Sequence, residues 1–269
     1  MPNANVNGIS VYYKVHGSGE PLVLIMGLGV GHGAWFFQTR AFKKFYQVIT
    51  FDNRDIGKTD KPSESYTIKT MADDTINLMD YLGVDKAHIL GVSLGGMIAQ
   101  EVAINYPQRV RKLVLGCTTA GEWEMSDTPS ELLRAIGLEE GSTEVDIRSV
   151  NINRLMNSMI PLAFNKRLYR MVILPLTKVY MKSVGFEGLA GQFEAAAGHS
   201  TLDRLHLIEA PTLVITGAED RLIPPHFSEV IASLIPNARL VKVEGGSHTF
   251  LAEMRGRFNK EVLDFLRDG

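Results

Sequence analysis

Short apolar runs recur along much of the chain, and glycine, proline or polar residues bound each of them. A strand that is buried on both faces reads as a continuous apolar run, because neither of its faces meets water. We therefore predict buried strands at residues 21–26, 47–51, 86–92, 111–115, 211–217 and 238–243. Segments with helical spacing of apolar residues lie between them, at 34–44, 67–82, 94–106, 227–234 and 251–267. Strands that alternate with helices in this way are typical of a mostly parallel, doubly wound α/β sheet.

Two segments depart from this alternation. Residues 3–16 alternate apolar and polar positions around Asn7-Gly8, which predicts an N-terminal hairpin. Residues 120–205, after the sixth strand, contain no clear buried strand but do contain helical patterns at 130–136 and 167–182. We interpret residues 120–205 as a helical cap inserted into an α/β core formed by residues 1–119 and 206–269.

The expected cap is rich in methionine, with five of the eleven in the chain: Met125, Met156, Met159, Met171 and Met181. Methionine is flexible and fills irregular apolar space. Most of these side chains are expected to pack the cap on itself, and a few to line a pocket. This composition favours a medium-sized, largely apolar substrate.

Charge and composition narrow the classes of function. The 269 residues carry a net charge of −2, so we expect no basic surface for nucleic acid or for an anionic membrane. No apolar run is long enough to span a membrane, and the first residues do not resemble a signal peptide. The single cysteine, Cys117, cannot form an internal disulfide, which fits a cytoplasmic protein. Charge and composition are compatible with a homodimer.

The residues Gly91-Val92-Ser93-Leu94-Gly95 fit the pattern G-x-S-x-G between a predicted strand and a predicted helix. A serine at such a sharp turn holds its hydroxyl clear of the sheet, and the flanking glycines allow strand and helix to approach closely. The helix N-terminus directs free N–H groups toward any negative charge that forms beside the serine. An ordinary strand-to-helix turn made of small residues is the alternative interpretation.

Four segments follow predicted strands and would meet at one edge of a parallel sheet, where ligands bind. They carry Leu28, Ser93, Asp220 and His248. A serine hydroxyl becomes a good nucleophile when a histidine takes its proton and a carboxylate fixes the histidine tautomer. The chain therefore supplies the three side chains that this chemistry needs, in the order serine, aspartate, histidine.

With these residues in this order, the chain resembles the α/β-hydrolase fold family, and in particular its capped esterase, enol-lactonase and cofactor-free haloperoxidase-like members. The similarity rests on residues 26–29, 51–54, 91–96, 211–220 and 245–248. The resemblance implies that Ser93 is the nucleophile and that His248 is first general base and then general acid. It also implies that Asp220, rather than its neighbour Glu219, orients His248, and that no cofactor or metal is required.

The resemblance further implies an oxyanion hole made by the backbone N–H groups of Leu28 and Leu94. The chain departs from the family pattern at two places nearby. Met26 stands where relatives often have histidine, and Asp55 stands where many have glycine. We expect the hole to survive the first change, since its donors are main-chain groups, whereas the second leaves the local conformation of the loop open.

Three other polar residues lie near the predicted site. We expect Asp52 and Arg54 to form a structural ion pair with each other, and His32 in the glycine-rich segment to be structural. Cys117 ends a predicted buried strand, and we expect it to be inert core packing.

The favoured hypothesis is a serine hydrolase that cleaves small carboxylic esters or lactones through an acyl-enzyme on Ser93. A carbon–carbon bond hydrolase of ring-cleavage products, or a perhydrolase or haloperoxidase-like enzyme, would use the same three residues and stays an alternative. A ligand receptor that has kept the fold without catalysis is the third hypothesis, and the intact set of Ser93, Asp220 and His248 argues against it.

Overall fold

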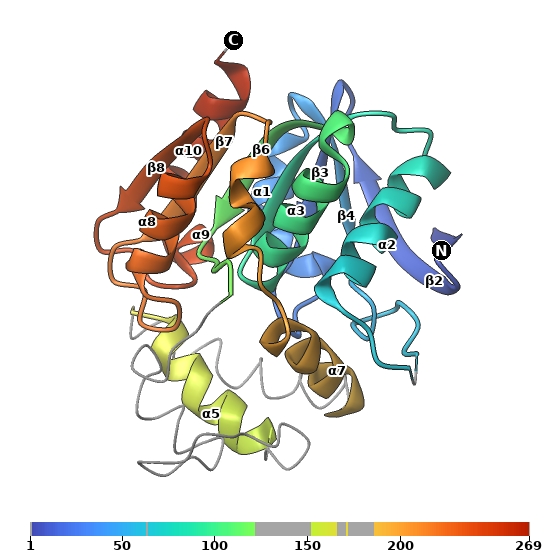
Figure 1. Cartoon of the computed structure of the whole chain (residues 1–269), viewed down its shortest axis with the longest axis horizontal. Helices are drawn as coiled ribbons and strands as arrows, with labels where there is room; N and C mark the ends of the chain where they lie inside the picture. The colour runs from blue at the N-terminus through green and yellow to red at the C-terminus, as the bar shows by residue number, and fades with distance from the viewer. Residues whose placement is uncertain (1, 63, 122–151, 166–170, 172–185, 269) are drawn as a thin grey trace.

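An eight-stranded sheet runs through the centre of the computed structural model (Figure 1). The structure describes residues 2–62, 64–121, 152–165, 171 and 186–268. The order of the strands across the sheet is β1-β2-β4-β3-β5-β6-β7-β8. Their bounds are β1 (Asn3–Val6), β2 (Ile9–His16), β3 (Glu20–Ile25), β4 (Tyr46–Phe51), β5 (Ala87–Val92), β6 (Val110–Gly116), β7 (Thr212–Gly217) and β8 (Ala238–Val243).

Strands β3 to β8 pair in parallel, whereas β1 and β2 pair antiparallel to each other and β2 pairs antiparallel to β4. The turn between β1 and β2 places Asn7 at a φ of 48° and Gly8 at 79°. Positive φ at both central residues is the geometry that hairpins of two-residue turns favour. The predicted N-terminal hairpin and the mostly parallel sheet are both confirmed.

Helices cover both faces of the sheet. Their bounds are α1 (Phe36–Phe42), α2 (Ile68–Tyr81), α3 (Leu94–Asn105), α5 (Ile152–Ala163), α7 (Phe186–Ala197), α8 (Pro225–Leu234), α9 (Phe250–Glu253) and α10 (Arg255–Arg267), and 3-10 turns span His32–Trp35, Pro107–Arg109 and Leu202–Leu207. Helices α2, α3 and α8 pack on one face, and α1 and α10 pack together on the other (Figure 1). This is the doubly wound arrangement that the alternation of strands and helices predicts.

The two faces form separate apolar clusters, and β3 shows how one strand serves both. Val23 and Ile25 belong to the cluster under α2, α3 and α8, whereas Leu22 and Leu24 belong to the cluster under α1 and α10. Successive side chains on a strand point to opposite faces, so an unbroken apolar run supplies both clusters at once. Among the described residues, no helix is long and apolar enough to cross a membrane.

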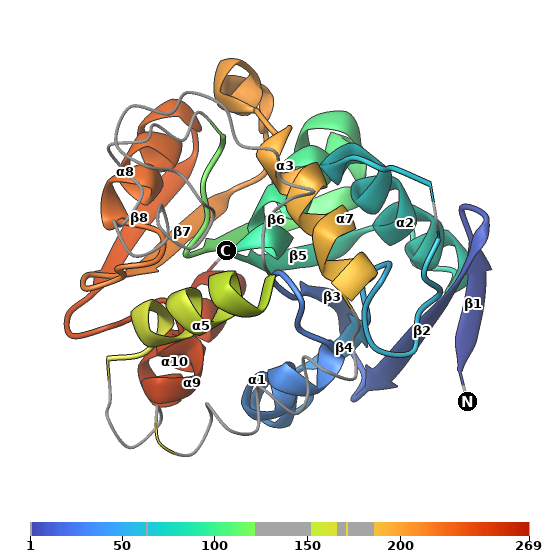
Figure 2. The same ribbon diagram turned by 90° about the horizontal axis from the view of Figure 1, so that it is seen from below.

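Between β6 and β7 the described residues form α5, α7 and a 3-10 turn. Helix α7 contacts the segments that follow β3 and β4, and the end of α5 contacts the segment that follows β8. Figure 2, which views the molecule from below, shows α5 and α7 lying across the ends of the central strands. The helical patterns predicted at 130–136 and 167–182 lie outside the described residues, apart from Met171, which is exposed.

Candidate active site

Ser93 stands between the last residue of β5 and the first of α3, with a φ of 53° and a ψ of −125°. Few L-residues adopt this conformation, so the surrounding structure must hold it. The Ser93 N–H donates to the Gly116 carbonyl at 2.9 Å, and the Thr118 hydroxyl donates to the Ser93 carbonyl at 2.8 Å. A Cβ atom on Gly95 would collide with the Ile25 carbonyl oxygen, so the turn requires glycine there. The predicted motif therefore folds as a strained turn fixed by its neighbours.

Asp220 follows β7 and His248 follows β8, and the two side chains meet. The distance from Asp220 Oδ2 to His248 Nδ1 is 2.8 Å, and both residues are buried. The other carboxylate oxygen, Oδ1, accepts the N–H groups of Leu222 and Ile223 at 2.9 Å each. An ionised carboxylate accepts hydrogen bonds, so this contact assigns the proton to Nδ1 and leaves Nε2 as the basic nitrogen.

Cys117 lies among the predicted catalytic residues rather than in an indifferent part of the core. Its sulfur is within 4.8 Å of ligand atoms of both Asp220 and His248. Burial, together with the nearby Asp220, raises the pKa of this thiol well above its usual value. Since β5 and β6 pair with Val92 opposite Gly116, residues 93 and 117 are the first beyond their ends. The alignment of β5 with β6 therefore predicts that Cys117 lies beside Ser93.

In the described part of the chain, this cluster shows neither a bond from the serine hydroxyl to the imidazole nor a set of groups suited to a metal. Among the described residues, the Ser93 hydroxyl makes no hydrogen bond to His248; in enzymes without substrate such bonds are often long and tighten on binding. Cys117, Asp220 and His248 are the one group of the described residues with spacing close enough for a metal. Because the thiol is kept protonated by burial and the carboxylate is bonded to the imidazole, we assign no metal to them.

The glycine-rich segment after β3 passes beside Ser93. A Cβ atom on Gly27 would lie 3.1 Å from Ser93 Cβ and 3.5 Å from its hydroxyl oxygen. The next N–H, that of Leu28, has no hydrogen-bond partner among the described residues. Leu94 begins α3, and a first helical residue has no acceptor for its N–H within the helix. Among the described residues the N–H groups of Leu28 and Leu94 therefore have no acceptor, and their role as an oxyanion hole stays a prediction.

The expected ion pair between Asp52 and Arg54 is wrong. Asp52 Oδ1 instead lies 2.7 Å from both the backbone nitrogen and Nδ1 of His32. Arg54 makes two bonds of 2.6 Å to Asp74 on α2. The two side chains diverge because Asp52 points to the glycine-rich segment and Arg54 points to the helix. His32 is therefore structural, as expected, but through a carboxylate partner that the sequence did not indicate.

Asp55, which departs from the family pattern, is buried with a φ of 70°. Glycine would adopt this left-handed conformation without strain, whereas an aspartate there is strained. The Tyr66 hydroxyl donates to Asp55 Oδ2 at 2.5 Å. Burial raises the pKa of Asp55, and burial and this carboxylate together raise the pKa of Tyr66. The hydrogen bond from the buried Tyr66 hydroxyl therefore stabilises the buried carboxylate of Asp55.

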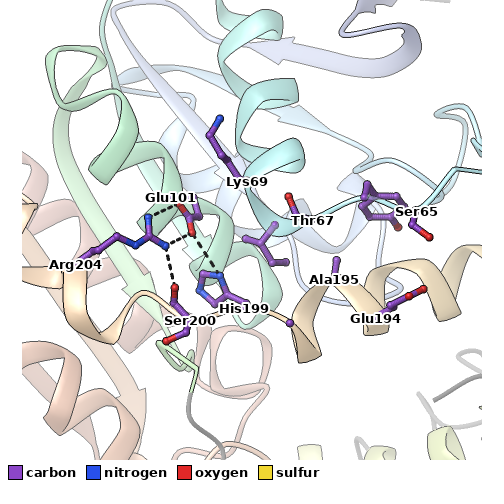
Figure 3. A pocket seen from close by; sticks show the side chains of 12 residues that line it. Ser65, Thr67, Lys69, Glu101, Glu194, Ala195, His199, Ser200 and Arg204 are labelled. Carbon is purple, nitrogen blue, oxygen red and sulfur yellow. Dashed lines mark hydrogen bonds and ion pairs between the residues drawn. The ribbon is translucent and has the colours of Figure 1, made fainter. Parts of the chain in front are cut away.

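A hollow of about 530 Å³ lies between α2, α3, α7 and residues 198–204 (Figure 3), and Ser93, Asp220 and His248 are not among the residues that line it. Arg204 lies 2.7 Å from Glu101 Oε1, and His199 Nδ1 lies 3.7 Å from the same atom. Burial lowers the pKa of His199 to about 4. The charges that line this hollow are largely paired with one another, so we assign no chemistry to it. The proximity of His199 to the Glu101 carboxylate could not be predicted from the sequence.

Comparisons with known proteins bear on the fold of the chain. A family model described as alpha/beta hydrolase fold matches residues 20–253. A protein from Azorhizobium caulinodans with the name "Putative carbamate hydrolase RutD" is 29% identical over 273 residues, 98% of each chain. The enol-lactonase from Burkholderia xenovorans superimposes with a TM-score of 0.87 at 26% identity, over 99% of this chain and 100% of that one. A meta-cleavage product hydrolase from Pseudomonas fluorescens superimposes with a TM-score of 0.80 at 26% identity, over 99% and 97%.

Proposed function

The chain belongs to the α/β-hydrolase fold family, and from this premise we propose that it is a serine hydrolase of small carboxylic esters or lactones. The observation that carries the proposal is the strained turn that holds Ser93 next to the Asp220–His248 pair. Ser93 and Cys117 follow paired residues of β5 and β6, and the Cys117 sulfur lies within 4.8 Å of ligand atoms of Asp220 and His248. Strained backbone at the N-terminus of a helix is costly, and it is concentrated at functional sites. Such a turn next to an aspartate–histidine pair supports nucleophilic catalysis over an ordinary strand-to-helix turn.

In the proposed mechanism, the Ser93 hydroxyl attacks the substrate carbonyl carbon while His248 Nε2 takes the hydroxyl proton. The Asp220 carboxylate, fixed by two backbone N–H groups, holds the imidazole in the correct tautomer and stabilises the imidazolium. The negative charge that forms on the carbonyl oxygen is stabilised by the N–H groups of Leu28 and Leu94. Losing one such donor typically costs about 3–4 kcal/mol of transition-state stabilisation.

Collapse of this intermediate breaks the carbon–oxygen bond, and the leaving alkoxide takes the proton from His248. The product of this step is an acyl-enzyme on Ser93. A water molecule then gives its proton to His248 and attacks the acyl carbon. The second collapse releases the carboxylic acid and returns the proton to Ser93. For a lactone, alcohol and acid leave as one hydroxy acid.

Similarity to the enol-lactonase supports an ester or lactone as substrate. Hydrolysis of a carbon–carbon bond beside a carbonyl is the second candidate, and similarity to the meta-cleavage product hydrolase supports it. The two differ in the leaving group, an alkoxide in one and a carbanion in the other. Turnover of a vinylogous diketone without hydrolysis of p-nitrophenyl acetate would favour the second candidate.

The experiment that tests the proposal measures hydrolysis of p-nitrophenyl esters of increasing acyl length and of a lactone panel, together with fluorophosphonate labelling. We expect ester or lactone turnover, and a label on Ser93. Ser93→Ala should abolish both, whereas Ser228→Ala should leave both unchanged, because Ser228 is a buried serine on α8 and is not one of the three proposed catalytic residues. Activity retained by Ser93→Ala, or a label on another residue, would overturn the proposal.

A further inference from the structure

Gln192 joins the segment between β6 and β7 to the glycine-rich segment after β3. It lies on α7 and is fully buried. Its Oε1 accepts the Gly29 N–H at 2.9 Å, and its Nε2 donates to the Arg54 carbonyl at 3.0 Å. Both ends of the amide are therefore used, on two segments that follow neighbouring strands. A buried amide whose oxygen and nitrogen both have hydrogen-bond partners favours one orientation of the groups around it.

The bond to Gly29 is immediately next to the proposed oxyanion donor. Gly29 follows Leu28 and adopts a φ of 69°, so the chain turns sharply at this point. The same segment is fixed on its other sides by Asn53, which donates to the Met26 carbonyl at 2.9 Å, and by Asp52, which accepts the His32 N–H at 2.7 Å. These two anchors come from the loop after β4. Gln192 supplies a third anchor, which comes from helix α7 and not from a loop that follows a strand.

The glycines make this anchoring necessary. A segment with four glycines among residues 27–33 has many conformations open to it and little intrinsic preference for one. An oxyanion donor has to be held close to its ideal place, because misplacement by about 1 Å can cost on the order of 100-fold in rate. Fixed position must therefore come from partners outside the segment.

We propose that Gln192 is a positioning residue: by holding Gly29, helix α7 sets the position of the Leu28 N–H, so that the oxyanion hole is complete only when α7 is docked. This inference rests on the proposed function, in which the Leu28 N–H stabilises the oxyanion. It assigns to α7 a role in transition-state stabilisation, in addition to any part in enclosing the substrate. The effect should appear in kcat rather than in KM, because the ground-state carbonyl depends little on the hole.

The test uses Gln192→Met, which keeps the length of the side chain but removes both hydrogen bonds. We expect kcat for a p-nitrophenyl ester to fall by about 10- to 100-fold with KM changed less than about threefold. The rate of Ser93 phosphonylation by a fluorophosphonate should fall in parallel. Hydrogen exchange of a peptide covering residues 26–33 should become faster. An unchanged kcat together with unchanged exchange in this peptide would overturn the inference.

Gln192→Glu provides a second, pH-dependent test. A protonated glutamic acid can accept from the Gly29 N–H and donate to the Arg54 carbonyl, as glutamine does, whereas the carboxylate lacks the donor. Burial favours the protonated form. The kcat of this variant relative to the wild type should therefore rise as the pH is lowered. A ratio that does not change with pH while Gln192→Met loses kcat would argue against hydrogen bonding as the cause.

Gln100→Met is the matched control. Gln100 is also fully buried, donating to the Thr119 carbonyl at 3.0 Å and accepting from the Thr201 hydroxyl at 2.5 Å. We expect this variant to lose stability without a fall in kcat or faster exchange at residues 26–33. If the wild type neither hydrolyses esters nor is labelled at Ser93, the proposed function fails, and the exchange comparison alone decides whether Gln192 holds the segment.

Discussion

Asp220 and His248 are joined at 2.8 Å through one carboxylate oxygen, while the other oxygen of Asp220 is held by two backbone N–H groups. The carboxylate is therefore oriented by the chain after β7 whether or not the imidazole is in place. This arrangement separates the role of Asp220 in structure from its role toward His248. A substitution that preserves the first and changes the second can test the proposed mechanism without disturbing the fold.

Asp220→Asn is that substitution. The asparagine oxygen can still accept the N–H groups of Leu222 and Ile223, but its amide nitrogen would donate to His248 Nδ1 and favour the wrong tautomer. We expect kcat to fall by about 10³- to 10⁴-fold with the unfolding midpoint in urea nearly unchanged. Ester hydrolysis and urea unfolding measure the two quantities.

The neighbouring carboxylate is the control for this prediction. Glu219 is exposed and accepts a hydrogen bond from the Asn165 amide at 2.9 Å. Glu219→Gln should keep kcat within about twofold of the wild type, because the Glu219 carboxylate bonds to Asn165, whereas His248 is held by Asp220. Full activity in Asp220→Asn, or a loss in Glu219→Gln equal to that expected for Asp220→Asn, would show that the acid has been assigned to the wrong residue.

Gly95→Ala should strongly destabilise the protein. An added Cβ atom would collide with the backbone carbonyls of Ile25 and Met26 on β3 and its following segment, and backbone cannot move aside as a side chain can. We expect a loss of more than about 2 kcal/mol in the free energy of unfolding, or failure to fold. Gly256→Ala, in the first turn of α10 with open space around it, should instead gain about 0.5–1 kcal/mol. Equal stability of the two variants would contradict the close approach of α3 to β3.

The fold was predictable because long apolar runs have few arrangements open to them. Runs such as 21–26 and 86–92 must be buried on both faces, and helices between parallel strands supply that cover. The same reasoning places the segments after the strands at one edge of the sheet. The contact between Asp220 and His248 follows from this, since β7 and β8 pair with Gly217 opposite Val243.

Partner choice among polar side chains could not be predicted in the same way. Asp52 and Arg54 are two residues apart and have opposite charges, yet each pairs with a residue from another element. Which pairs form depends on where His32 and Asp74 lie in three dimensions, and hydrophobic periodicity does not carry that information. The role of Gln192 was missed for a related reason. Its partners are backbone groups, and the sequence does not show which backbone groups an amide side chain will meet.

Ser93→Gly should be more stable than Ser93→Ala. At a φ of 53° and a ψ of −125°, alanine keeps the strain that serine has, whereas glycine adopts the conformation freely. Glycine also gains entropy in the unfolded chain, which offsets part of the benefit, so we expect a net difference of about 1 kcal/mol. Urea unfolding of the two inactive variants measures it. A less stable glycine variant would mean that the turn at Ser93 carries no strain.

Acid should destabilise the protein partly through His199. The buried ring has its pKa lowered from 6.5 to about 4, and its neighbours Glu101 and Arg204 are paired with each other. Above pH 6.5 the ring is neutral in both the folded and the unfolded chain, so stability is at its full value. As the pH falls from 6.5 toward 4, the unfolded chain binds a proton that the folded chain does not, and stability decreases.

This shift corresponds to a loss of up to about 3 kcal/mol between pH 6.5 and pH 4. His199→Gln, which cannot titrate, should show a smaller fall in the free energy of unfolding over this range. Gln100→Met is the control, since it changes a buried side chain that cannot titrate and should leave the pH dependence as in the wild type. The lowered pKa of Glu101 adds a separate loss below its usual value of 4.5, and the lowered pKa values of His16 and His88 add losses that both proteins share, so the difference between wild type and His199→Gln from pH 6.5 to pH 5 reports on His199. An identical slope for wild type and His199→Gln in that interval would show that the ring is protonated in the folded chain.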